Sequence, residues 1–220
     1  MDKLEFYLNE EENKYGKVYT DINYAIDNIA DFISDENLKK RKYASKVDVI
    51  KKYIKLLEDT KVKVNKKGRF KIFNNTDKYK TVLENYKYKH SKDFQQLDNC
   101  SKCACLNCVQ ECEFDTCLGC RNNSKIVYCD HKKINVTRHS NFTINLVNDN
   151  TQEENTYEVL VTIQNIEEDK RYIIIRNIRD YDDKYILYYY PGISEDNYGE
   201  ITDAEEFDYI AEIFISCNIE

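Results

Sequence analysis

Residues 156–178 read TYEVLVTIQNIEEDKRYIIIRNI, and this stretch decides the fold class of the 220-residue chain. Its two halves are rich in β-branched and aromatic side chains, which favour strands. Between them lies a short acidic segment, residues 167–170, that is suited to a turn. The pattern therefore predicts two antiparallel strands joined by this turn.

Similar strand patterns lie on both sides of this stretch. INVT at residues 134–137 and NFTINLVND at 141–149 alternate in polarity, and KYILYYYPG at 184–192 ends at the chain's only proline. A helix is then expected from Thr202, with Glu205 completing a capping box. One face of that helix would carry Phe207, Ile210, Ala211 and Phe214. We therefore predict an α+β fold, in which a small antiparallel sheet packs against one C-terminal helix.

Three segments of this region carry a family resemblance. They are YEVLVTIQNIEEDKRYIIIRNI, KYILYYYPG and GEITDAEEFDYIAEIF, and the Asp-x-Glu-Glu-Phe start of the last is the most distinctive. With them, residues 141–215 resemble the bacterial domain of unknown function 1292. The whole chain is also similar to clostridial proteins that join such a domain to a cysteine-rich segment. The resemblance implies a small α+β domain from a low-GC Gram-positive bacterium, and it brings no activity, cofactor or catalytic residue.

A dense cysteine cluster precedes the predicted sheet. Eight of the nine cysteines lie within thirty residues, with three C-x2-C pairs and a histidine after the last cysteine. Two thiolates at this spacing can turn back onto one cation, and the absence of a secretory signal favours reduced thiols over disulfides. We therefore expect a zinc-binding segment. Its candidate ligands are Cys100, Cys103, Cys105, Cys108, Cys112, Cys117, Cys120, Cys129 and His131.

The pairing of these ligands stays open at this level. One arrangement has two zinc ions, the first held by Cys100, Cys103, Cys117 and Cys120. The second ion would then be held by Cys105, Cys108, Cys129 and either Cys112 or His131. Alternatively, the first four cysteines share one ion, or bridging thiolates gather all nine ligands around three zinc ions. An iron–sulfur cluster is a further alternative, although neither standard ferredoxin spacing is present.

The sequence offers little for catalysis. Only five glycines occur, and no P-loop, Rossmann or nucleophile-elbow motif is present. Zinc sites rich in thiolates are usually closed and structural. Asp130 and His131, with His139 and Asn141 further on, are loosely similar to a His-Asn-His nuclease, but the second cysteine pair of that pattern is missing. We therefore expect a protein that is not an enzyme.

Charge is distributed unevenly along the chain. Residues 1–38 carry 3 basic and 10 acidic side chains, residues 39–92 carry 19 and 5, and residues 133–220 carry 7 and 19, within a net charge of -7. A basic block between acidic flanks suggests an acidic partner, either nucleic acid or protein. An AT-rich coding bias toward lysine would produce the same excess.

The basic block is predicted to be mostly helical. Asp21 can cap one helix and Ser45 a second, and a short helix is expected at residues 76–88. KVKVNKKGRFKIF at residues 61–73 alternates around a turn and predicts a basic β-hairpin. This order resembles a winged-helix element, although a helical cap with a solvated lysine face gives the same pattern. The candidate partner-binding residues are Lys46, Lys51, Lys52, Lys55, Lys66, Lys67 and Arg69.

These patterns predict three regions: a basic-centred helical region at 1–95, a metal-binding module at 96–133 and the sheet with its helix at 134–220. The function expected of them is a non-enzymatic, zinc-stabilised adaptor that engages an acidic partner. The alternative is a thiol-based redox or metal sensor, in which the ninth ligand exchanges. No apolar run reaches membrane-spanning length and the N-terminus is acidic, so we expect a cytoplasmic protein without a membrane partner. No small-molecule substrate is indicated.

Overall fold

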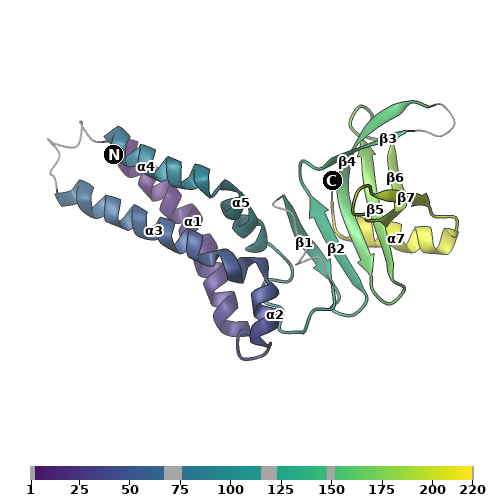
Figure 1. The fold of residues 1–220 in the computed structure, drawn as a ribbon, viewed down its shortest axis with the longest axis horizontal. Helices are drawn as coiled ribbons and strands as arrows, with labels where there is room; N and C mark the ends of the chain where they lie inside the picture. The colour runs from purple at the N-terminus through teal and green to yellow at the C-terminus, as the bar shows by residue number, and fades with distance from the viewer. Residues whose placement is uncertain (1–2, 67–75, 115–122, 148–151, 220) are drawn as a thin grey trace. The chain divides into compact units, whose positions relative to one another are not determined.

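The structure is a computed structural model that describes residues 3–66, 76–114, 123–147 and 152–219. It divides the chain into two compact units, shown in Figure 1, and each unit has its own hydrophobic core. The helical unit comprises Met1–Lys102 and Leu106–Glu111, and the sheet unit comprises Cys103–Cys105 and Cys112–Glu220. The predicted α+β class is confirmed, and the predicted cysteine module at 96–133 contributes residues to both units.

The helical unit contains five helices within the described residues. They are α1 (Lys3–Ile29), α2 (Asp35–Lys40), α3 (Lys42–Lys66), α4 (Thr76–Lys89) and α5 (Ser91–Cys100). The helix expected at residues 76–88 is confirmed as α4. None of the described helices combines the length and the apolar composition needed to cross a bilayer.

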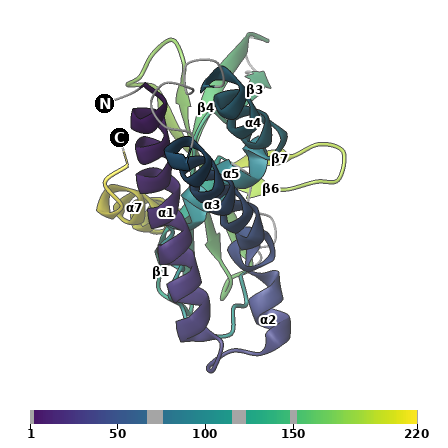
Figure 2. The same ribbon diagram turned by 90° about the vertical axis from the view of Figure 1, so that its left-hand side faces the viewer.

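A seam of apolar side chains joins α1 to α3, which lie side by side in Figure 2. Buried residues recur on each helix at alternating intervals of three and four, because this spacing keeps them on one face. On α1 they are Leu4, Leu8, Tyr15, Val18, Ile22, Ala25 and Ile29. On α3 they are Tyr43, Ile50, Tyr53, Leu57 and Thr60, and the partly buried Val64 continues the series.

Three predictions for this region are wrong. Asp21 lies inside α1, and α3 begins before Ser45. Val62 and Val64, predicted as the first arm of a β-hairpin, lie in α3. The i, i+2 spacing of these valines imitates a strand, but Val64 also falls on the buried face of the helix, and the helical packing prevails. Residues 67–75, which hold the rest of the predicted hairpin, lie outside the described residues.

The sheet unit is built on seven antiparallel strands in the described residues. They are β1 (Ser124–Cys129), β2 (Ile134–His139), β3 (Thr143–Val147), β4 (Glu154–Asn165), β5 (Lys170–Asn177), β6 (Lys184–Tyr190) and β7 (Asn197–Glu200). The order across the sheet is β1-β2-β4-β5-β6-β7, and β3 also pairs with β4. The strands expected from residue 134 through 190 are confirmed, whereas β1 and β7 were not predicted.

Strand β4 is long enough to pair with two strands along one edge. β2 pairs with its second half and β3 with its first half, so β2 and β3 form one long strand interrupted at residues 140–142. A register shift in β4 at Leu160 accompanies this interruption. Because the shift adds one residue, Val159 and Val161 point to opposite faces although they are two positions apart.

Helix α7 (Ala204–Ser216) covers one face of the sheet, as Figure 1 shows. Ile210 is fully buried there, and Phe214 packs beside it against β-strand residues. The predicted start is wrong by one residue, because the cap is Asp203, whose Oδ1 accepts hydrogen bonds from the backbone of Glu205 and Glu206.

Candidate metal centre and basic surface

The candidate zinc ligands are distributed between the two units. Cys100 and Cys108 belong to the helical unit, whereas Cys103, Cys105, Cys112, Cys129 and His131 belong to the sheet unit. Cys117 and Cys120 lie outside the described residues. None of the seven described cysteines is in a disulfide.

Cys105 and Cys129 are brought together in the sheet unit. The backbone N–H of Ala104 donates to the carbonyl of Ile126 at 2.9 Å, which places residues 103–105 beside β1. Cys129 is the last residue of β1, and its sulfur accepts a hydrogen bond from the Cys105 thiol. Two candidate ligands 24 positions apart in the sequence are thus brought together by a backbone hydrogen bond between residue 104 and β1.

The turn between β1 and β2 is built around the Asp130 carboxylate. Its Oδ1 accepts hydrogen bonds from the backbone N–H groups of Lys132, Lys133 and Ile134, at 2.8 to 2.9 Å. Burial raises the pKa of Asp130, but these three donors outweigh it and hold the pKa below its ordinary value. Asp130 therefore positions the loop, and its oxygen is already engaged by backbone amides.

This turn directs donors at the Cys129 sulfur. His131 has a φ of 63°, and its backbone N–H hydrogen-bonds to Cys129. The side chain of Asn135, which is paired directly opposite Cys129 in the sheet, also lowers the pKa of the Cys129 thiol. Its amide nitrogen is buried and has no hydrogen-bond acceptor among the described residues. Cys105, His131 and Asn135 together lower the pKa of the Cys129 thiol against the opposing effect of burial.

The other described cysteines lie in different settings. Cys100 ends α5 and accepts a hydrogen bond from Gln96 at 3.5 Å, and the Cys108 carbonyl accepts one from the buried Arg41. Cys112 lies 3.5 Å from the carbonyl of Phe114. Within the described ranges, no group of three or more Cys, His, Asp or Glu side chains is placed to hold one metal ion. The Cys105–Cys129 pair is therefore the part of the predicted site that the structure assembles.

Asn135 and Asp130 were not among the predicted site residues. The sequence offers a weak signal for Asp130, because an aspartate ahead of a strand is a common turn residue. Asn135 carries no such signal, since only the β1–β2 register brings its amide to Cys129.

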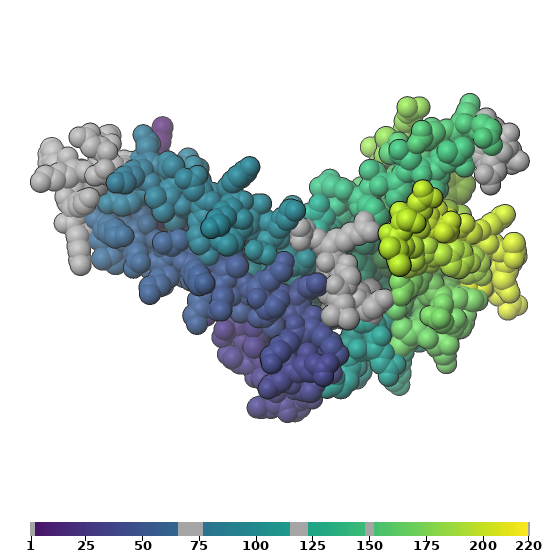
Figure 3. All heavy atoms as spheres, viewed as in Figure 1, coloured from purple at the N-terminus to yellow at the C-terminus, as the bar shows by residue number. Residues whose placement is uncertain are grey.

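The candidate basic surface lies on α3, which with α4 forms much of the face of the helical unit seen in Figure 3. Lys51, Lys52 and Lys55 are exposed there. Lys46 instead pairs with Asp93 at 2.9 Å and lowers the pKa of that carboxyl. Lys66 ends α3, and Lys67 and Arg69 lie outside the described residues.

Acidic side chains interrupt this surface. Asp48, Glu58 and Asp59 are also exposed on α3, between or beside the exposed lysines. A continuous phosphate backbone would meet these carboxylates together with the ammonium groups. The surface is therefore of mixed charge, with lysine in excess.

Comparison of the chain with protein-family models, with curated proteins and with solved structures gave no match. The resemblance of residues 141–215 to the domain of unknown function 1292 therefore stays a prediction.

Proposed function

We propose that this chain is a non-enzymatic, zinc-stabilised binding protein of the cytoplasm that engages an acidic partner. The zinc would be structural, held by thiolates from the cysteine segment. The exposed lysines of α3 would contact the partner.

The meeting of Cys105 and Cys129 is the observation that carries this proposal. A thiolate that ligates zinc is commonly supported by N–H donors directed at its sulfur, and Cys129 receives one from the backbone of His131. The buried amide nitrogen of Asn135 has no hydrogen-bond acceptor in the described part of the chain. An anionic sulfur at Cys129 would satisfy this donor, so the residues present fit two of the four ligands of a thiolate-rich site.

Metal bound here would stabilise the edge of the sheet. Residues 103–105 belong to the sheet unit although the helical unit flanks them in sequence, and a metal ion would hold them against β1. Because an unfolded chain lacks the assembled site, the free energy of zinc binding adds to the free energy of folding.

The mixed charge of α3 favours an acidic protein segment over nucleic acid as the partner. Carboxylates on a flexible segment can be spaced to reach Lys51 and Lys55 while avoiding Asp48 and Asp59. A regular phosphate backbone has no such freedom.

Elemental analysis of anaerobically purified protein tests the metal site. We expect two zinc ions per chain in the unaltered protein and about one fewer in the Cys129→Ser variant, since a closed zinc site needs four ligands. Cys217→Ser is the matched control, because Cys217 lies at the end of α7 and packs in the core under that helix. Unaltered protein without metal, or without a thiolate-to-cobalt absorption band after Co²⁺ loading, would contradict the proposal.

The contact between two thiols also favours the second candidate, a thiol-based sensor. Hydrogen peroxide would oxidise Cys105 and Cys129 to a disulfide: both thiol protons and two electrons reduce the peroxide to two water molecules, and one S–S bond forms. Zinc that stays bound under mild peroxide supports the structural site. Zinc release together with a Cys105–Cys129 disulfide, identified by mass spectrometry, supports the sensor instead.

A further inference from the structure

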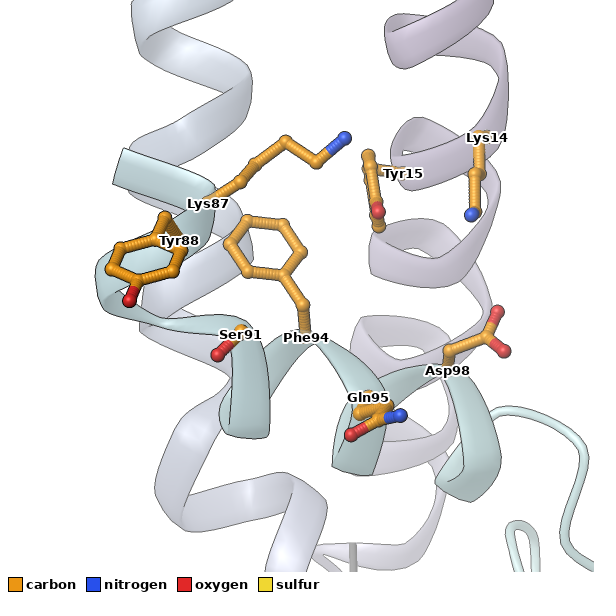
Figure 4. Close-up of a pocket in the computed structure, with 8 residues that line it drawn as sticks. All are labelled: Lys14, Tyr15, Lys87, Tyr88, Ser91, Phe94, Gln95 and Asp98. Atoms are coloured by element: carbon orange, nitrogen blue, oxygen red, sulfur yellow. The ribbon is translucent and has the colours of Figure 1, made fainter. Parts of the chain in front are cut away.

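The helical unit contains an open pocket that is unrelated to the cysteines. Its volume is about 430 Å³, and α1, α4 and α5 contribute its walls, as Figure 4 shows. This volume lies in the range of natural small-molecule sites, roughly 300–1,000 Å³. The pocket is formed entirely by residues of one unit.

Aromatic rings form the floor and one rim of this pocket. Phe94 is buried, and its ring meets the ring of Tyr15 edge to face at 4.8 Å between centroids. Tyr88 lines the rim and is 85% exposed. An exposed ring beside buried ones can close onto a flat ligand, because aromatic groups gain from stacked and edge-to-face contacts.

Two ammonium groups reach into the same space. The Nζ atoms of Lys14 and Lys87 each lie 5.2 Å from the centroid of the Tyr15 ring, and Figure 4 shows Lys87 reaching toward that ring from α4. The Lys87 ammonium is paired with Glu11 at 2.8 Å. In the part of the chain that the structure describes, no carboxylate lies within ion-pair distance of Lys14.

The remaining polar groups leave one positive charge in excess. Asp98 also lines the pocket, but its carboxylate is neutralised by Lys102 at 2.6 Å. Gln95 supplies an uncharged amide that can hydrogen-bond in either direction. Once the two ion pairs are set aside, the ammonium of Lys14 is the charge available to a ligand.

We propose that this pocket binds a small planar aromatic anion, with its ring against the exposed Tyr88 and its anionic group at Lys14. The ring supplies most of the buried area, and the charge fixes the orientation. The inference does not depend on the metal site, since no cysteine lines the pocket.

A set of three probes tests the ring and the charge separately. The first is 2-naphthoate, which carries both features, the second is the neutral 2-naphthalenemethanol, and the third is acetate. We expect 2-naphthoate to bind with an affinity about tenfold or more above that of either of the others, because each lacks one half of the recognition. Isothermal titration calorimetry with the full-length chain measures all three.

Two lysine variants locate the site. Lys14→Gln should weaken 2-naphthoate binding by about tenfold through loss of a charge-assisted contact. Lys17→Gln removes an exposed lysine of the same helix that pairs with Asp21, and it should leave the affinity unchanged. Equal affinities for naphthoate and its neutral isostere, or an equal effect of the two variants, would overturn the proposal, as would absence of naphthoate binding.

Discussion

Glu206 lies in the first turn of α7, where its carboxylate accepts hydrogen bonds from the hydroxyls of Tyr172 and Tyr188 at 2.7 and 2.8 Å. The ammonium of Lys170 approaches it at 2.8 Å. These partners come from β5 and β6, so one side chain joins the helix to two strands. Burial raises the pKa of Glu206, but the combined effect of Lys170 and the two tyrosines lowers it below the ordinary value of 4.5.

Replacing Glu206 with Gln should lower the free energy of unfolding by about 2 kcal/mol at pH 7, since hydrogen bonds to a charged group contribute roughly that much. The folded-state pKa is depressed, so the stabilisation is complete above 4.5 and is lost as the pH falls through the folded-state pKa. The difference between the unaltered protein and Glu206→Gln should therefore shrink on acidification. Urea unfolding at several pH values measures it.

The neighbouring Glu205 provides the control for this prediction. Its side chain is exposed, so Glu205→Gln should change stability little at any pH. A Glu206→Gln deficit that stays constant from pH 7 down to pH 3 would show that the carboxylate charge has no part in holding the helix.

The first turn of α7 also shows which properties of single residues could be predicted from the sequence and which could not. An acidic start to this helix could be predicted, because Asp, Glu and Glu precede an apolar face. The separate roles of Asp203 as the cap and Glu206 as the link to the sheet could not. They depend on which strands lie under the helix, and those strands are adjacent only in the folded chain.

At the scale of the elements, the Glu11 carboxylate lies in the seam between α1 and α3. Glu11 occupies the position between Leu8 and Tyr15 where the spacing of α1 calls for an apolar residue. It accepts a hydrogen bond from the Tyr53 hydroxyl of α3 and pairs with Lys87 of α4. A polar residue in such a seam selects one register, because any shift of the helices leaves it unpaired.

Glu11→Gln should lower the free energy of unfolding by about 2 kcal/mol, because it leaves the partly buried Lys87 ammonium without its counter-ion. Glu12→Gln is the matched control. Glu12 pairs with Lys61, but its side chain is 39% exposed, and the loss should stay below about 1 kcal/mol. Urea unfolding followed by far-UV circular dichroism compares the two. Equal losses of unfolding free energy in the two variants would contradict a special role for Glu11 in the seam.

The elements differ in how well their patterns could be interpreted. Strands β2 to β6 were predictable because their runs of β-branched and aromatic residues are bounded by turn residues. The hairpin prediction failed because Val62 and Val64 suit both a strand and the heptad spacing of α3, and only packing against α1 decides between them. The cysteine spacing could suggest metal binding, but the Cys105–Cys129 contact depends on β1, whose pairing with residue 104 no local pattern reveals.

At the scale of the whole molecule, ion pairs within the helical unit account for part of the uneven charge distribution along the chain. The acidic α1 packs on the basic α3, and Glu12 and Glu11 pair with Lys61 of α3 and Lys87 of α4. Some of the lysine excess is therefore used within the helical unit. The exposed lysines of α3 remain, and they are available to the acidic partner proposed above.

A titration with poly-L-glutamate tests whether these lysines form a binding surface. We expect affinity at low ionic strength that falls steeply as salt is added, because exposed charges are screened beyond a Debye length of roughly 10 Å at 0.1 M. The triple variant Lys51→Gln, Lys52→Gln, Lys55→Gln should bind about tenfold more weakly or worse, since it removes three neighbouring exposed ammonium groups of α3. Fluorescence anisotropy of labelled polymer measures both.

The control for this titration removes the same number of positive charges from the sheet unit instead of from α3. Lys125→Gln, Lys132→Gln and Lys184→Gln lie in the sheet unit, so a variant that combines them should retain the affinity of the unaltered chain. Short duplex DNA should bind more weakly than poly-L-glutamate, because its fixed phosphates would lie against Asp48, Glu58 and Asp59 as well as the lysines. Tighter binding of DNA would favour a nucleic-acid partner over an acidic protein segment. Equal weakening by both triple variants would mean that net charge, and not the surface of α3, governs association.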